Sequence, residues 1–432
     1  MYETLNSWWT AFLDITYVRK LTRMLDRLWV RIAALGILSL IAIATARLTD
    51  RFIPDFLDGF ISVDEVKNLL EIIANSMLAI TIFSLSVMVT VFRAASSQWT
   101  PRVHRLMLDD RTTQNTLATF LGAYIFALTS IILIDTEVFE EDQIVVLFVF
   151  LVAIVILILM AIVNWITHLQ TLGSLIEVTR RIETQAAAAF QHRMEKPCLG
   201  ANALRSEDDI PTKEYPYRAY KTGYIQHIYE GALSEIAEEA DTDIYITAPI
   251  GKFVFEGDPI LYFSKEIEDV DEKIRSNLSI GDLRTFEQDP RFGLIVLGEI
   301  GSKALSPGIN DPGTAIDVLG RMGRIFEGYA DEMDKAMEDM PHPRLWVPPL
   351  QAADMIEDGF DPIARDGGSI VEVQLMLQKV LADLADHPDE TLAKAAEEAA
   401  KRAFSRAEKH MKYGDDLERL KKVVPAEVSS QS

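Results

Sequence analysis

Four stretches of the chain are apolar over the length that a membrane crossing requires. The hydrocarbon core of a bilayer is crossed by about 20 residues of helix. Such nearly charge-free runs are longer than buried helices of soluble proteins usually contain. We therefore expect four transmembrane helices, at about 29–48, 72–92, 116–134 and 144–166.

The charges that flank these stretches predict an orientation. Arginine and lysine gather before the first stretch and between the second and third, whereas the other two connections are acidic. By the positive-inside rule, both termini are expected in the cytoplasm of a bacterial inner membrane. Residues 1–28 lack the apolar core of a signal peptide. They contain Trp8 and Trp9 and are expected to form an interfacial helix on the inner leaflet.

The second stretch carries a stripe at helical spacing, with steps of three and four residues. Its members are Asn75, Ala79, Ile82, Ser86, Thr90, Arg93 and Ser97. Polar groups inside a bilayer often face a water-filled path, which predicts a pore-lining helix with Arg93 at its cytoplasmic mouth. Close packing between helices is the alternative, and from the sequence alone it is slightly favoured. The third stretch has a small face around Gly122 that favours packing.

The turn after the second stretch contains Pro101, which should end that helix near Trp99. Trp99, Arg102 and Arg105 are expected at the membrane interface, where arginine meets anionic headgroups.

The pattern changes beyond the fourth stretch. We expect its helix to continue into the cytosol, so that residues 177–216 form a helical extension and a polar linker. A small β-rich module is expected at 217–263, a mostly helical region at 264–425 and a disordered tail at 426–432. Residues 368–424 read as long amphipathic helix.

Alternating residues at 221–229 and 243–263 predict the strands of the β-rich module. The segment GKFVFEGDPIL resembles the hairpins of small biotinyl-lipoyl-type barrels. Such carriers are modified on a lysine at the hairpin tip, and this segment has no such lysine at its tip. Its absence favours a structural barrel over a carrier.

Two polar motifs follow. Arg284, Glu287 and Asp289 fit a structural salt-bridge network better than a ligand clamp. The second motif is a helix–turn–helix joint, in which glycine ends one helix and an Asp-Pro pair caps the next. A joint or subunit contact is favoured there over a ligand site. Its residues are Ser306, Pro307, Gly308, Asn310, Asp311 and Pro312.

Charge divides the chain in the same way. The mean hydropathy is +0.11. Residues 1–176 hold 12 basic and 16 acidic residues, a net charge of −4, and the remaining 30 and 49 give residues 177–432 a net charge of −19. This excess of acid argues against nucleic acid as a partner. One cysteine, scattered histidines and no nucleotide-binding or hydrolase motif argue against an enzyme, a cofactor or a metal site.

Several motifs resemble the bacterial predicted membrane proteins of domain of unknown function 2254. They include FSLSVMVTVFRAASSQWTPR, GYIQHI, LRTFEQDPRFG and KALSPGINDPGTA. The resemblance implies an inner-membrane protein with a cytosolic domain and carries no established activity. Gly313 departs from it, because a bulkier residue is expected there.

The sequence thus predicts an α-helical integral membrane protein with a C-terminal cytosolic α+β domain that contains a small barrel-like module. Our first hypothesis is a homo-oligomeric channel lined by the second helix, with an acidic cytosolic vestibule. The alternative is a non-conducting, membrane-anchored sensor or interaction protein whose cytosolic domain binds a partner or small ligand.

Overall fold

The computed structural model describes residues 28–49, 61–96, 100–103, 110–136, 138, 144–332 and 340–424. The chain forms two compact units. The first comprises residues 1–97 and 104–174, and the second comprises residues 98–103 and 175–432. The expected N-terminal interfacial helix and disordered tail lie outside the described residues.

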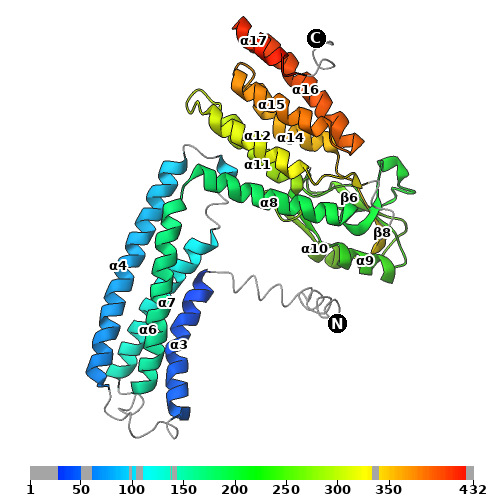
Figure 1. Cartoon of the computed structure of the whole chain (residues 1–432). Coiled ribbons are helices and arrows are strands. Elements are labelled where there is room, and N and C mark those ends of the chain that lie inside the picture. The colour runs from blue at the N-terminus through cyan, green and yellow to red at the C-terminus, as the bar shows by residue number, and fades with distance from the viewer. Residues whose placement is uncertain are drawn as a thin grey trace. The chain divides into compact units, whose positions relative to one another are not determined.

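The first unit is built from helices (Figure 1). These are α3 (Leu28–Thr49), α4 (Val63–Ser96), α6 (Arg111–Asp135) and α7 (Ile144–Thr171). Of the described residues, three helices are long and apolar enough to cross a membrane, namely α4, α6 and α7. In α3 the described apolar stretch, Ile32–Ala42, is shorter than a crossing requires. Three spans are therefore supported, and the fourth stays a prediction.

Helix α6 packs against α3, α4 and α7, the other described helices of this unit. Gly122 allows the approach of α3, because a Cβ there would lie 2.5 Å from the Leu35 side chain. The packing role predicted for this small face is confirmed. Fully buried Phe120, Phe126 and Leu147 fill the centre of the unit, and exposed apolar side chains cover the outside of α4 and α7.

The fourth predicted helix does not continue unbroken into the next segment. Helix α7 ends at Thr171, and α8 (Leu175–Glu195) begins after Gly173. Gly173 has φ of +88°, a left-handed conformation that α-helix lacks. The expectation of one continuous helix was wrong at this residue.

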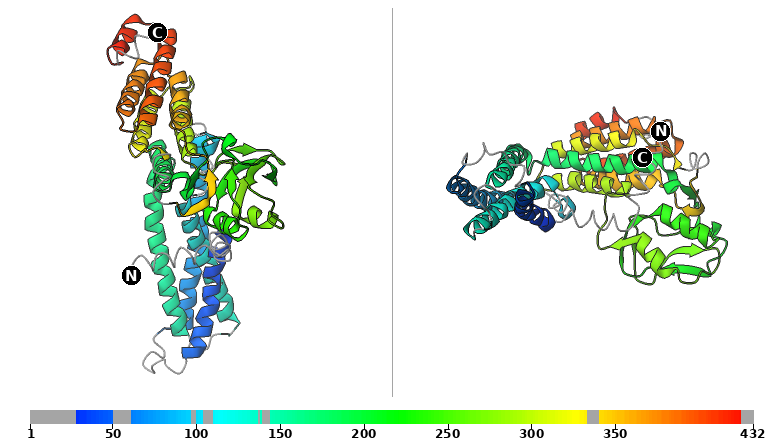
Figure 2. Two further views of the ribbon diagram at one scale, coloured as in Figure 1. Left: turned by 90° about the vertical axis from the view of Figure 1, so that its right-hand side faces the viewer. Right: turned by 90° about the horizontal axis from the view of Figure 1, so that it is seen from below.

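Most of the second unit is helical, and most of its helices lie together in one group, apart from the strands (Figure 2). Helix α8 packs against α11 and α12, and α14, α15 and α16 extend this layer. The bounds are α11 (Pro290–Ala304), α12 (Pro312–Phe326), α14 (Ala352–Asp366), α15 (Val371–Ala385), α16 (Glu390–His410) and α17 (Gly414–Lys421). The region expected to form long helix is therefore divided into α15, α16 and α17.

The described strands form two sheets. The five-stranded sheet has the order β1-β8-β4-β6-β2, and the three-stranded antiparallel sheet has the order β5-β3-β7. The bounds are β1 (Ala201–Ala203), β2 (Tyr215–Arg218), β3 (Gly223–Ile228), β4 (Ile244–Ile246), β5 (Phe253–Val254), β6 (Pro259–Phe263), β7 (Leu278–Gly281) and β8 (His342–Val347). Helices α9 (Glu230–Glu239) and α10 (Asp271–Asn277) accompany them. Both sheets share one apolar core with α9.

The described strands do not close into the small barrel that the sequence predicts. Strand β5 pairs with β3, whereas β6 pairs with β4 and β2, so β5 and β6 belong to different sheets. Strand β8, from far along the chain, lies parallel between β1 and β4. The local pattern identified several strands but gave the wrong pairing.

Candidate functional site

The polar stripe of α4 lies on the side of the helix that faces away from its own unit. Its six described members are all exposed: Asn75, Ala79, Ile82, Ser86, Thr90 and Arg93. The opposite face is buried and carries Val66, Leu70, Ile73, Met77 and Ser84. Packing among the described residues of one chain therefore does not account for the stripe. Ser97 lies outside the described residues.

The stripe is longer than the sequence pattern alone had shown. Asp64, Asn68 and Glu71 precede Asn75 at the same steps of four and three residues, and each is exposed. Successive steps of four, three and four repeat every 11 residues, which stays close to one side of a straight helix. The same spacing rule that identified the part from Asn75 onward could have found these three earlier residues from the sequence.

The polar groups of the stripe differ in how they are satisfied. The Ser86 hydroxyl donates to the Ile82 carbonyl at 2.9 Å, and the Thr90 hydroxyl donates to the Ser86 carbonyl at 2.8 Å. Among the described residues, the Asn75 amide has no hydrogen-bond partner. Asn75 is thus the member within the predicted span that most needs a partner from outside its own chain.

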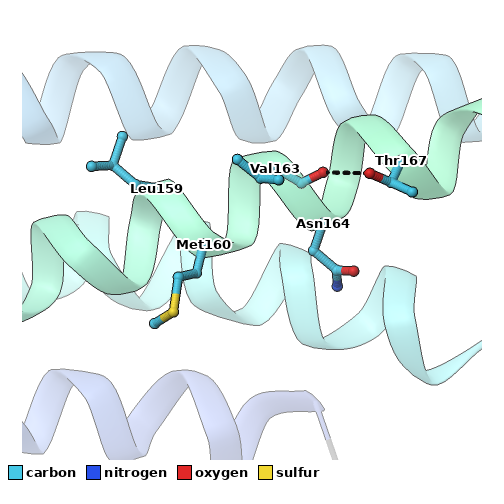
Figure 3. Close-up of a pocket in the computed structure, with 5 residues that line it drawn as sticks. All are labelled: Leu159, Met160, Val163, Asn164 and Thr167. Carbon is cyan, nitrogen blue, oxygen red and sulfur yellow. Dashed lines mark hydrogen bonds between the residues drawn. The ribbon is translucent and has the colours of Figure 1, made fainter.

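A shallow hollow of about 460 Å³ lies on α7, another exposed face of the first unit. Its lining comes from Leu159, Met160, Val163, Asn164 and Thr167. Figure 3 shows Met160 and Asn164 pointing to the same side of the helix, and the Thr167 hydroxyl donating to the Val163 carbonyl at 3.0 Å. The lining is mostly apolar and presents no titratable group.

A buried polar cluster joins the start of α6 to the end of α7. Asp110 caps α6 by accepting hydrogen bonds from the Thr113 backbone N–H at 2.9 Å and its hydroxyl at 2.6 Å. The same carboxylate lies 2.8 Å from His168 Nε2. Sequence reasoning missed this cluster, because Asp110 and His168 are brought together only by folding.

The expected membrane-interface residues are mostly outside the described part of the chain, namely Trp8, Trp9, Trp99 and Arg105. Arg102 is described and exposed, and its guanidinium pairs with Glu299 of α11 within the second unit.

The motif around Arg284 forms a structural ion pair. Its guanidinium makes two hydrogen bonds to the Asp289 carboxylate, at 2.7 and 2.8 Å, and Asp289 also accepts from the Phe292 backbone N–H at 3.1 Å. Asp289 is 2% exposed and caps α11. Glu287 is exposed and lies 3.7 Å from His227. The arrangement ties the loop to the start of α11.

The joint between α11 and α12 has the predicted N-cap. The Asp311 carboxylate accepts from the Thr314 backbone N–H at 3.1 Å and from its hydroxyl at 2.6 Å. These two bonds hold the pKa of Asp311 below its ordinary value, and the bond from the Thr314 hydroxyl has the larger effect. The left-handed residue of the turn is Asn310, with φ of +52°, and not the expected Gly308.

The tip of this joint is open. Pro307, Gly308 and Asn310 are exposed, whereas Ser306, Asp311 and Pro312 are partly buried. Gly313 is exposed as well, and a Cβ there would lie 3.3 Å from Asp311 Oδ1. A subunit contact or a ligand at the tip stays a prediction.

A second buried ion pair lies in the second unit. Arg193 of α8 pairs with Glu332 through two hydrogen bonds, and it also donates to the Pro348 carbonyl at 3.1 Å. The Cys198 thiol donates to the Glu332 carboxylate at 3.7 Å. Burial, aided by this carboxylate, raises the pKa of Cys198 to about 12 and keeps the thiol protonated. These contacts fasten the end of α8 to the segment between α12 and β8 and to the segment after β8.

Within the described residues, no group of three or more histidine, cysteine, aspartate or glutamate side chains is arranged to hold a metal ion. The feature that the folded chain leaves unexplained is therefore the outward polar stripe of α4, which we take as the candidate functional site.

Three apolar helices of spanning length and an α+β unit define a membrane protein. The chain belongs to the family of predicted membrane proteins DUF2254, whose model matches residues 26–383. It is similar to uncharacterized proteins of Mycobacterium bovis and Mycobacterium tuberculosis, at 21% identity over 366 residues. This alignment covers 82% of the chain and 69% of each relative. No solved structure is significantly similar to it.

Proposed function

We propose that several copies of this chain assemble in the bacterial inner membrane and form a channel lined by the α4 stripe. The observation that carries the proposal is the direction of the stripe, which faces away from the unit that α4 helps to build. The acidic second unit then supplies a vestibule on the cytosolic side.

Hydrocarbon offers no partners to polar side chains, so intramembrane polar residues face protein or water. The interior of the first unit is filled by Phe120, Phe126 and Leu147. A polar path therefore belongs between copies and not inside one copy. A symmetry axis beside α4 brings the stripes of all copies around one path.

The proposal includes a membrane topology for each copy. Helix α3 is the first of four spans, and both termini lie in the cytoplasm. The support is the arrangement of charge, with basic connections on one side and acidic connections on the other. Helix α3 packs on α6 and α7, as a member of the same bundle does.

The proposal is tested by recording currents across a planar bilayer that contains the purified protein. Discrete current steps are expected from the native chain. Thr90→Trp should abolish them, because its indole would fill the path, while the oligomer stays intact on size exclusion. Ile156→Trp is the matched control, since Ile156 is 52% exposed on α7, away from the stripe.

Native protein that is inserted and oligomeric but silent would overturn the channel and favour the non-conducting sensor. Equal currents from native and Thr90→Trp protein would remove α4 from the path.

A further inference from the structure

The first part of the stripe, from Asn68 to Asn75, contains side chains of the kinds that bind cations. We propose that Glu71, with Asn68 and Asn75 on either side, forms the ring that selects cations in the channel. This inference rests on the proposed function, because the ring exists only when several copies surround one path.

The three side chains share one face of α4 and are exposed. At 1.5 Å per residue, Asn68 and Asn75 lie within about 6 Å of Glu71 along the helix axis. Carboxylate and amide oxygens are the ligands that hard cations take from proteins. Rings of acidic side chains give cation channels their selectivity.

The Glu71 carboxylate is available for this role. Among the described residues it forms no hydrogen bond or ion pair. The nearest basic residue in sequence, Lys67, is held by Asp135 of α6 at 2.5 Å. Lys67 is thereby directed toward α6, and it interacts with Glu71 only at a longer range than an ion pair.

The middle of the stripe is compatible with cations. Because Ser86 and Thr90 donate their hydroxyl hydrogens to backbone carbonyls, their oxygen lone pairs remain free to coordinate a cation or to accept a hydrogen bond from its water. Of the described stripe residues, Arg93 carries the only positive charge, and it lies at the end opposite Glu71.

The test is the reversal potential of single-channel currents in asymmetric KCl. The native channel is expected to prefer potassium over chloride. Glu71→Gln removes one carboxylate from every copy and should lower the permeability ratio by more than about fivefold, which is the factor that a single unit charge about 4 Å from an ion makes in water. Glu65→Gln is the matched control, because Glu65 lies off the stripe and accepts a hydrogen bond from the Ser62 N–H at 3.0 Å. It should leave the ratio unchanged.

A second variant, which is expected to gain selectivity, keeps the test decisive if Glu71→Gln does not fold. Asn68→Asp adds a carboxylate one turn away and should raise the preference for potassium. Currents whose ratio changes in neither Glu71→Gln nor Asn68→Asp would overturn the cation ring and leave the channel standing. A native channel that prefers chloride would overturn the ring as well. A silent native protein would overturn the channel and the ring together.

Discussion

At the scale of single residues, Asp311 has two measurable roles. Its carboxylate caps α12 and holds the Thr314 hydroxyl. We expect Asp311→Ala to lower the free energy of unfolding by about 1 kcal/mol, the usual loss when an N-cap is removed. Asp311→Asn keeps a capping oxygen and should lose much less. Chemical denaturation of the purified protein, followed by circular dichroism, measures both, and equal losses would contradict the capping role.

The same residue predicts a pH dependence. The pKa of Asp311 in the folded chain lies below its ordinary value of 3.8, mainly because the Thr314 hydroxyl donates to the carboxylate. Its stabilising contribution is therefore complete above that ordinary value and is lost as the pH falls through the folded value. Asp311→Asn has no carboxylate at this position, so this part of the acid dependence should disappear. The free energies of unfolding of the native and Asp311→Asn proteins, compared below pH 3.8, measure it.

Contacts such as this cap could be predicted from the sequence when both partners are close together in the chain. The Asp311 cap needs only the Asp-Pro pair and a threonine three residues later. The Asp110–His168 contact joins residues far apart in the chain, and so does the pairing of Arg193 with Glu332. No spacing rule reaches across such distances, since these pairs depend on which helices become neighbours.

At the scale of elements, helices were predicted better than strand pairs. A helix shows its apolar face within its own sequence, as the buried side of α4 does. A strand shows only its alternation, and its partner can lie anywhere. Strand β8 joins β1 and β4 from a region expected to be mostly helical. The stripe of α4 was predictable for the same reason as the helix, whereas its outward direction required the packing of α6.

The break between α7 and α8 gives a prediction at this scale. Gly173→Ala places a Cβ in a left-handed conformation and within 2.7 Å of the Val91 side chain. We expect a loss of about 1–2 kcal/mol from the backbone conformation. Gly231→Ala is the control, because a Cβ there meets nothing within 4 Å inside α9. Thermal unfolding in detergent should separate the two, and equal melting temperatures would show that Gly173 tolerates a side chain.

At the scale of the whole molecule, the two units are built for different surroundings. The first exposes apolar side chains such as Phe83, Val149 and Val163, whereas residues 177–432 carry a net charge of −19. Exposed apolar surface is stable in lipid, and a highly charged surface is stable in water. This division could be predicted from hydropathy and charge alone, because it depends on sums over many residues and not on any single contact.

The proposed orientation can be tested on intact bacterial spheroplasts with a membrane-impermeant maleimide. Thr136, at the end of α6, is expected outside, and exposed Asp208 is expected in the cytosol. Thr136→Cys should therefore label at once, and Asp208→Cys only after permeabilisation. The native chain is its own control, because its Cys198 is buried and its raised pKa keeps the thiol unreactive. Labelling of Asp208→Cys in intact spheroplasts would place the acidic unit outside. It would also show that the basic connections do not set the orientation, and the proposed cytosolic vestibule would be excluded.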